Sequence, residues 1–258
     1  MKIFLKPFQW LYCLYAFFLF VILMILIFPL VLISSFWGKI KGGNFIYDLC
    51  RYWGDIWMFL IGIKHTNIFE SPPDRLKQYI FVANHISYMD IPLIFKTIRN
   101  QPIRVLGKYE MKRIPIFGFI YQKAVVMVDR SSPYQRSKSV RQLKSVLRKG
   151  ISIFIYPEGT FNETRKPLKD FYDGAFRIAI ETQTAVKPIL FLDTYDRLNY
   201  KSLLSLHPGK SRAVFLEEVD VMGLLPKDLP LLKKSVYDTM ERKLKEYHAS
   251  WIKEDAVK

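Results

Sequence analysis

Two short polar stretches carry residue types that could perform acid–base chemistry. The first is 84–90, where His85 and Asp90 lie five positions apart, directly after an apolar run at 79–83. A carboxylate against one imidazole nitrogen fixes the tautomer and supports the imidazolium, so the other nitrogen can act as a general base. The same spacing is also typical of a simple hydrogen bond within a loop.

The second stretch is 156–160, with the sequence Tyr-Pro-Glu-Gly-Thr, and it follows the apolar run 151–156. Its carboxylate, Glu158, could accept hydrogen bonds from the hydroxyl groups of a polyol. Its glycine, Gly159, permits close backbone approach or a positive φ angle. An ordinary turn is the alternative interpretation, because Pro and Gly are both frequent turn residues.

The elements that must position these residues form an alternating pattern. Short apolar runs and helical stretches follow one another after residue 63, which predicts an α/β sheet flanked by helices. Strands are expected at 79–83, 104–106, 124–128, 151–156, 186–192 and 213–219, and helices at 91–98, 133–149, 174–182 and 229–252. Both polar stretches directly follow strands, so we expect them at a sheet edge, where ligands collect in such folds.

The N-terminal part is far more apolar than the rest. Residues 7–38 carry no charge, and this length exceeds the about 20 residues that a spanning helix needs. A cleaved signal peptide has a shorter apolar region, and Pro29 could kink the segment. We expect 1–63 to be a membrane-anchoring helix or helical hairpin that spans or dips into the bilayer, followed by one globular domain, 64–258.

A second apolar stretch, 44–63, contains three charged residues and is a poor independent span. It is suited to a helix that lies against the first one or in the interface, with four aromatic side chains at headgroup level, Tyr47, Tyr52, Trp53 and Trp57. A core helix of the globular domain is the alternative.

Four segments, in order, resemble the motifs of the glycerolipid acyltransferase family, of which the 1-acylglycerol-3-phosphate acyltransferases are best known. Residues 84–90 match the first motif, a His and an Asp separated by four residues. Residues 114–118, together with residues 128–130, resemble the second motif. The third, usually Phe-Pro-Glu-Gly-Thr, resembles 156–160, and the fourth, a strand with a proline, resembles 186–189.

The resemblance implies a mixed sheet and a membrane-bound O-acyltransferase that makes phosphatidic acid from lysophosphatidic acid. His85 would remove the proton from the lysolipid hydroxyl, which attacks an acyl thioester directly, and Asp90 would orient His85. Substrate binding is expected from Asn84, Lys108, Arg130, Glu158, Gly159 and Thr160. No cofactor is implied. Acyl-coenzyme A or acyl-acyl-carrier protein would be the co-substrate, and the domain would work at the cytoplasmic face of the inner membrane.

One position departs from the family pattern. The third motif usually continues with an arginine that helps to bind the substrate phosphate, and this chain has Phe161 there. The planar fork of arginine suits phosphate, whereas phenylalanine has no donor. Either Arg165 or Lys166 takes over, or the acceptor is another lysolipid, for example one that contains an amino acid. A non-catalytic basic membrane adaptor is the alternative outside the enzymes.

Composition limits the remaining classes. The chain has 39 Lys and Arg against 23 Asp and Glu, a net charge of +16, and the expected helix 133–149 contains no acidic residue. We expect the basic side of that helix to be either a solvated face or a surface that binds anionic lipid headgroups or an acidic acyl carrier. A nucleic-acid partner is not expected beside a membrane segment. Two cysteines, and three histidines without partners at ligand spacing (His65, His207 and His248), predict no metal site.

Overall fold

One mixed sheet organises the chain. The computed structural model describes residues 6–99, 101–128 and 132–252. Within them, seven strands form a sheet in the order β1-β7-β6-β2-β5-β3-β4. All neighbours are parallel except β6 and β7, which are antiparallel. The strands are β1 (Ile63–Phe69), β2 (Ile80–Ala83), β3 (Ile103–Lys108), β4 (Val125–Val128), β5 (Ser152–Ile155), β6 (Val186–Phe191) and β7 (Gly209–Phe215).

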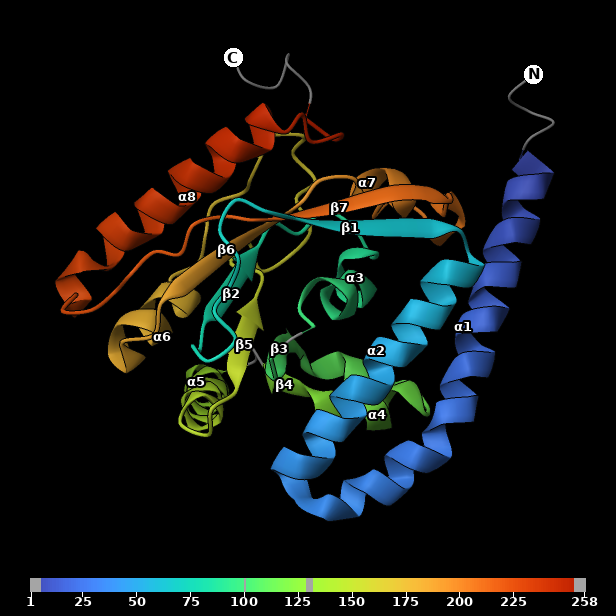
Figure 1. The fold of residues 1–258 in the computed structure, drawn as a ribbon, viewed down its shortest axis with the longest axis horizontal. Coiled ribbons are helices and arrows are strands. Elements are labelled where there is room, and N and C mark those ends of the chain that lie inside the picture. The colour runs from blue at the N-terminus through green and yellow to red at the C-terminus, as the bar shows by residue number, and fades with distance from the viewer. Residues whose placement is uncertain (1–5, 100, 129–131, 253–258) are drawn as a thin grey trace.

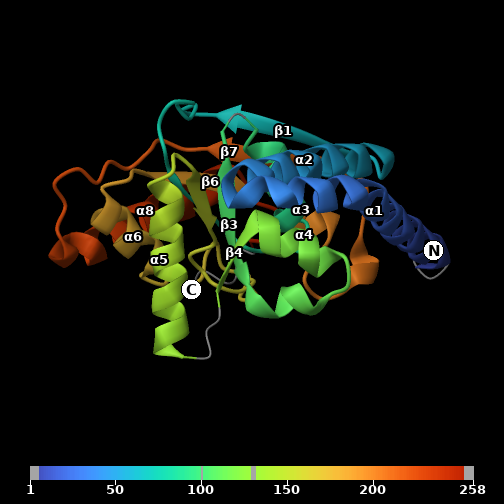
Figure 2. The same cartoon turned by 90° about the horizontal axis from the view of Figure 1, so that it is seen from below.

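Helices cover both faces of this sheet (Figures 1 and 2). One face carries α1 (Lys6–Ser34), α2 (Gly43–Leu60), α3 (Asp90–Thr97) and α4 (Phe117–Ala124). The other carries α5 (Pro133–Leu147), α6 (Gly174–Thr182) and α8 (Leu229–Glu246), while the short α7 (Thr194–Arg197) follows β6. Single turns of 3-10 or π-helix occur at Ser35–Trp37, Gly38–Gly42, Tyr109–Arg113, Leu203–Ser205 and Pro226–Asp228. The predicted mixed α/β sheet flanked by helices is confirmed.

The two central strands explain why the sheet forms here. Every residue of β2 and β5 is buried, as expected for parallel strands that are covered on both faces. Side chains alternate between two cores: Ile80 and Ile153 join the one beneath α5, α6 and α8, whereas Phe81 and Phe154 join the one beneath α1, α2 and α3. The loops that follow β2 and β5 therefore leave the sheet at the same edge.

The sequence prediction missed or displaced three elements. β1 was not expected, and it is an edge strand that pairs only with β7. The strand expected at 213–219 runs from Gly209 to Phe215, and no apolar run marks its start because residues 210–212 are polar. The helix α4 was also not expected; it is a short element of eight residues between β3 and β4.

The N-terminal segment forms the expected helical hairpin. α1 and α2 lie side by side (Figures 1 and 2), and the Trp57 ring N–H donates to the Ala16 carbonyl at 2.8 Å. Within the described residues, one helical stretch, Lys6–Leu60, is long and apolar enough to cross a membrane. Large apolar side chains are exposed along α1, among them Phe8, Leu11, Phe17, Phe18, Leu26 and Ile33. The expected boundary at residue 63 falls between α2 and β1. Both sides of it share one core, so the division stays a prediction.

The aromatic residues of α2 differ from the expectation. Tyr47, Trp53 and Trp57 are 2%, 6% and 7% exposed and pack inside the protein, so their placement at headgroup level is wrong. Only Tyr52, at 65%, is exposed. One face of α2 therefore belongs to the core, as the alternative interpretation proposed, while another face remains open.

The basic helix α5 begins as expected. The Ser132 hydroxyl accepts a hydrogen bond from the Gln135 backbone N–H at 3.2 Å and caps the helix. The helix lies on the other side of the sheet from α1 and α2 (Figures 1 and 2). Lys144 pairs with Glu181 of α6. The three interpretations of this surface stay predictions.

Candidate active site

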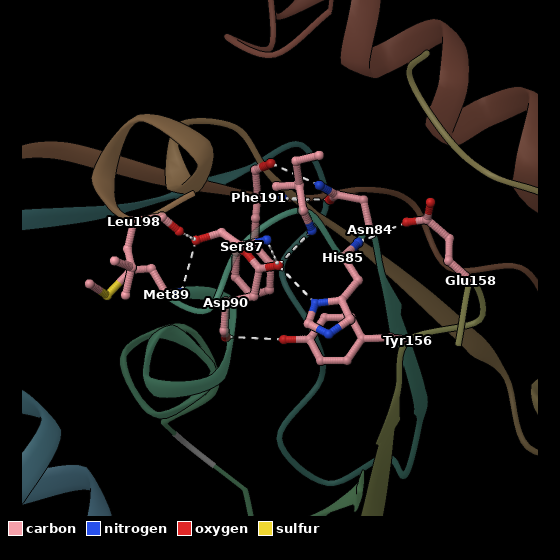
Figure 3. A network of polar contacts seen from close by, with 10 residues as sticks. Asn84, His85, Ser87, Met89, Asp90, Tyr156, Glu158, Phe191 and Leu198 are labelled. Carbon is pink, nitrogen blue, oxygen red and sulfur yellow. Dashed lines mark hydrogen bonds and ion pairs between the residues drawn. The ribbon is translucent and has the colours of Figure 1, made fainter. Parts of the chain in front are cut away.

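The loop after β2 is fixed by the side chain of Asn84. The amide oxygen of Asn84 accepts from the Phe191 N–H at 2.8 Å, and its amide nitrogen donates to the Phe191 carbonyl at 3.0 Å (Figure 3). Only 1% of Asn84 is exposed. Both polar ends of this side chain therefore join the end of β2 to β6, and the predicted contact of Asn84 with substrate stays a prediction.

His85 and Asp90 meet within this loop. Nδ1 of His85 lies 2.9 Å from Oδ2 of Asp90 (Figure 3), and Asp90 is fully buried as the first residue of α3. The same oxygen accepts the backbone N–H groups of Ile86 at 2.7 Å and Ser87 at 2.8 Å. Because a carboxylate only accepts, Nδ1 carries the proton and Nε2 presents its lone pair.

Three N–H donors and the start of α3 surround the Asp90 side chain. Such donors form charge-assisted hydrogen bonds with a carboxylate, and the N-terminus of a helix carries the positive end of its dipole. Within the described residues, Nε2 of His85 makes no hydrogen bond and 13% of the side chain is exposed. The loop therefore holds an imidazole whose outer nitrogen is free to accept a proton.

Two aromatic rings pack against this imidazole. Tyr156, directly after β5, stacks on His85 with ring centroids 4.0 Å apart and planes 13° apart. Phe161 lies on it with centroids 4.4 Å apart and a tilt of 55°. The Tyr156 hydroxyl also donates to the Asp90 carbonyl at 3.0 Å (Figure 3). Tyr156 thus fixes both the plane of the imidazole and the start of α3.

Glu158 joins the two polar stretches. One carboxylate oxygen accepts from the His85 backbone N–H at 2.8 Å, and the other from the Lys169 N–H at 2.7 Å. The residue is 1% exposed, and burial raises the pKa of Glu158 to about 8, against the lowering effect of these two N–H groups. Each oxygen accepts one backbone N–H, so Glu158 positions the His85 backbone, and its predicted contact with a polyol stays a prediction.

The two residues after Glu158 are Gly159 and Thr160. Gly159 has a φ of 73°, a left-handed conformation. Glycine adopts this conformation without the steric cost that a side chain would bring, which explains the glycine at this position. Thr160 is exposed, and its hydroxyl accepts from Nζ of Lys169 at 2.7 Å. Thr160 and Lys169 are thus polar groups near the site that remain accessible to a ligand.

The two predicted basic contacts have different outcomes. Lys108 ends β3 and is exposed. β5 lies between β3 and β2, so Lys108 shares the sheet edge with His85 but stands two strands away, a distance of about 10 Å. Arg130 lies outside the described residues. The predicted roles of both in substrate binding stay predictions.

Phe161 belongs to an aromatic cluster. Besides His85, it contacts the rings of Tyr88 at 4.8 Å and Tyr200 at 6.4 Å. Of the two candidates to replace an arginine here, Arg165 lies over the ring of Tyr195 at 4.5 Å. Lys166 is exposed, and its carbonyl accepts hydrogen bonds from Asn162 and Trp251. The group beside the His85 imidazole is therefore apolar, and the Arg165 guanidinium is directed at a tyrosine.

Sequence spacing did not identify the positioning role of two residues. Tyr156 was noted only as the first residue of the second polar stretch and of the third motif. Ser87 was not singled out, although its hydroxyl accepts from the Met89 N–H at 2.9 Å and donates to the Leu198 carbonyl (Figure 3). The only available signal was their place inside the two polar stretches. Their partners are 66 and 111 positions away in the chain.

Comparisons with known proteins agree with this geometry. The family model described as Acyltransferase matches residues 63–192, half of the chain. The chain is 27% identical over 175 residues to the chloroplastic 1-acyl-sn-glycerol-3-phosphate acyltransferase of Arabidopsis thaliana, covering 67% of this chain and 47% of that protein. It is 30% identical over 110 residues to the lyso-ornithine lipid O-acyltransferase of Pseudomonas aeruginosa, covering 43% of this chain and 41% of that protein.

A solved structure covers nearly the whole chain. The 1-acyl-sn-glycerophosphate acyltransferase of Thermotoga maritima superposes with a TM-score of 0.73 at 25% identity, over 96% of this chain and 99% of that one. The chain spans about half the length of the curated relatives it matches first. By sequence and by fold, this chain belongs to the acyltransferase family.

Proposed function

We propose that this chain is a membrane-bound O-acyltransferase that converts 1-acyl-glycerol-3-phosphate to phosphatidic acid. Nε2 of His85 accepts the proton of the free hydroxyl while the hydroxyl oxygen attacks the carbonyl carbon of an acyl thioester. The tetrahedral intermediate collapses, the carbon–sulfur bond breaks, and the imidazolium returns its proton to the departing thiolate. Asp90 stabilises the imidazolium throughout, because its charge lies against Nδ1.

The His85–Asp90 pair is the observation that carries this proposal. A simple loop hydrogen bond between a histidine and an aspartate does not require further contacts that hold the imidazole ring in place. Here three hydrogen bonds hold the Asp90 oxygen, Tyr156 stacks on the imidazole, and Glu158 holds the His85 backbone. A non-catalytic adaptor gives no reason for this concentration of contacts on one imidazole with an open Nε2.

The test offers purified full-length protein an acyl thioester and lysophosphatidic acid and measures thiol release and phosphatidic acid. His85→Ala is expected to abolish both, because no other group replaces the base. His207→Ala is the matched control, since His207 is exposed and lies outside the site. Full activity in folded His85→Ala protein would overturn the proposed mechanism.

A second acceptor class is favoured by Phe161. This ring contacts His85 directly and offers no donor to a phosphate, which suits a lysolipid without a phosphomonoester, such as one that contains an amino acid. The same assay with phosphate-free lysolipids distinguishes the two acceptors. Product only from the phosphate-free lysolipid would move the assignment to this class.

The N-terminal hairpin supports a membrane location. α1 exposes a continuous set of large apolar side chains, as expected of a helix whose outer surface meets lipid. We place the catalytic domain at the cytoplasmic face of the inner membrane, because basic residues next to apolar segments concentrate on that side. Acyl-coenzyme A or acyl-acyl-carrier protein serves as the donor, and no cofactor takes part. Protease accessibility of the domain in inside-out vesicles tests the location.

A further inference from the structure

A polar cavity lies at the sheet edge opposite to His85. His85 follows the carboxyl end of β2, whereas Pro102 precedes β3, and both strands run parallel to β5. The two residues therefore lie at opposite edges of the sheet. The cavity has a volume of about 290 Å³ and is lined by Asn44, Tyr47, Asp48, Arg51, Arg99, Gln101 and Pro102.

The surroundings of this cavity carry an excess of positive charge. A neighbouring cavity of about 370 Å³ shares Arg51 and Arg99 with it and adds Arg75. Arg51 pairs with Asp48 at 2.8 Å, while Asp55 holds both Arg99, at 2.7 Å, and Lys96, at 2.8 Å. Arg75 is exposed and makes no ion pair with any described residue. Among the residues that line the two cavities are three arginines and one acidic residue, Asp48, which favours an anionic ligand.

Two buried polar groups in the first cavity have no partner. Tyr47 is 2% exposed, and its hydroxyl makes no hydrogen bond with the part of the chain that the structure describes. The same holds for the amide nitrogen of Gln101. Buried polar groups normally have partners, so two unpaired groups that line one cavity need an explanation. Both can donate, and an anion's oxygens would accept from them.

The position of the cavity on α2 indicates where such an anion comes from. Residues 44, 48 and 51 form one row along the helix at helical spacing, and all three line the cavity. The next row around the helix, at positions 45, 52, 56 and 59, holds Phe and Tyr side chains and Ile56, all exposed. The cavity thus borders the open apolar face of the hairpin, an arrangement that suits a ligand with both a phosphate group and apolar chains.

We propose that these two adjoining cavities, which share Arg51 and Arg99, together bind the phosphate group of an anionic phospholipid, at a site separate from the one at His85. Arg51 and Arg75 neutralise the phosphate charge, and the Tyr47 hydroxyl donates to one of its oxygens. The bound headgroup fixes the hairpin and the loop between β1 and β2 against each other, because Arg51 belongs to α2 and Arg75 to that loop.

The experiment measures the thermal midpoint of the full-length protein in a nonionic detergent. The ligands are dihexanoyl phosphatidylglycerol, dihexanoyl phosphatidylcholine and inorganic phosphate, each titrated separately. A ligand that binds the folded state raises the midpoint in a saturable way. We expect that rise with phosphatidylglycerol, and we expect it unchanged in His85→Ala, whose altered residue lies at the opposite edge.

Variants of the cavity sharpen the test. Tyr47→Phe should leave the midpoint without ligand unchanged, because its hydroxyl has no partner to lose, and should weaken phosphatidylglycerol binding roughly fivefold. Arg51→Gln with Arg75→Gln should weaken it about tenfold or more. Arg148→Gln with Lys149→Gln removes the same charge from exposed positions at the end of α5 and should have no such effect.

Four results would overturn the proposal. These are the lack of a saturable rise, an equal loss of binding in the α5 control, loss of the rise in His85→Ala, and unchanged binding in both cavity variants. A rise given equally by inorganic phosphate would overturn the assignment to a lipid.

Discussion

Replacing Asp90 by asparagine separates the charge of this residue from its geometry. Oδ2 accepts three N–H groups, from Ile86, Ser87 and the His85 ring, at 2.7 to 2.9 Å. An amide oxygen at the same place keeps all three hydrogen bonds. If the asparagine amide turned over, its NH2 group would face the buried N–H groups of Ile86 and Ser87. Each of these N–H groups would then lack an acceptor, at a cost of about 1–3 kcal/mol. We therefore expect the amide oxygen, and with it the imidazole tautomer, to stay in place.

The expected loss in Asp90→Asn is then electrostatic. Two unit charges 2.9 Å apart interact by about 6 kcal/mol at an effective dielectric constant of about 20. The imidazolium shares its charge between two nitrogens, so about half of this energy, roughly 3 kcal/mol, is lost from the transition state. That corresponds to a decrease in kcat of about a hundredfold. The amide nitrogen takes the place of Oδ1, which has no partner among the described residues, so the free energy of unfolding falls by about 1–3 kcal/mol.

Steady-state acyl transfer with both substrates saturating measures the change in kcat, and thermal unfolding in the same detergent measures the stability. A decrease of about 10⁴ would indicate the wrong tautomer, as when the amide turns, and would refute the argument from the three donors. A decrease of less than about threefold would show that the Asp90 charge does not act in the transition state.

Three further predictions concern neighbouring residues. Phe161→Arg should raise kcat/KM for lysophosphatidic acid about tenfold relative to a phosphate-free lysolipid, because it supplies a charge-assisted donor; an unchanged ratio would exclude a phosphate contact there. Tyr156→Phe keeps the stack on the imidazole and loses one hydrogen bond, so stability should fall by about 1 kcal/mol while kcat in the acyl-transfer assay falls far less than in Tyr156→Leu. Burial lowers the pKa of His65 to about 4. As the pH falls, the unfolded chain therefore binds a proton at His65 before the folded chain does, and the free energy of unfolding should decrease between pH about 6.5 and 4. Denaturant unfolding should show a weaker dependence of this free energy on pH for His65→Gln, but not for the exposed control His207→Gln.

The two candidate sites divide the sheet between its edges. The site at His85 lies at the carboxyl ends of β2 and β5, where the two polar loops begin. The cavity lined by Arg51 and Arg99 lies at the other edge, next to Gln101 and Pro102, which directly precede β3. An anionic lipid at the second site would hold α2 and the β1–β2 loop without contact with the reacting groups. Binding there is therefore separable from acyl transfer by mutation.

Local patterns were sufficient where the tertiary environment is uniform. β2 and β5 are buried on both faces, so their apolar runs identify them at once. β1 has only one neighbouring strand and keeps Lys64 and Asn67 in a mixed pattern, so no continuous apolar run marks it. An edge strand tolerates polar residues because one of its sides faces no partner strand, and this is why it was missed.

The sequence by itself determined the family, the residue types that act on a hydroxyl and a thioester, and the apolar hairpin ahead of the sheet. Only the tertiary structure decided what Asn84, Tyr156 and Glu158 do, because their partners lie 66 to 107 positions away and no local spacing records such contacts. The same holds for the cavity of Arg51, Arg75 and Arg99. A short motif fixes which chemistry is possible, whereas the packing of distant strands fixes which of its side chains reach a substrate and which hold the others in place.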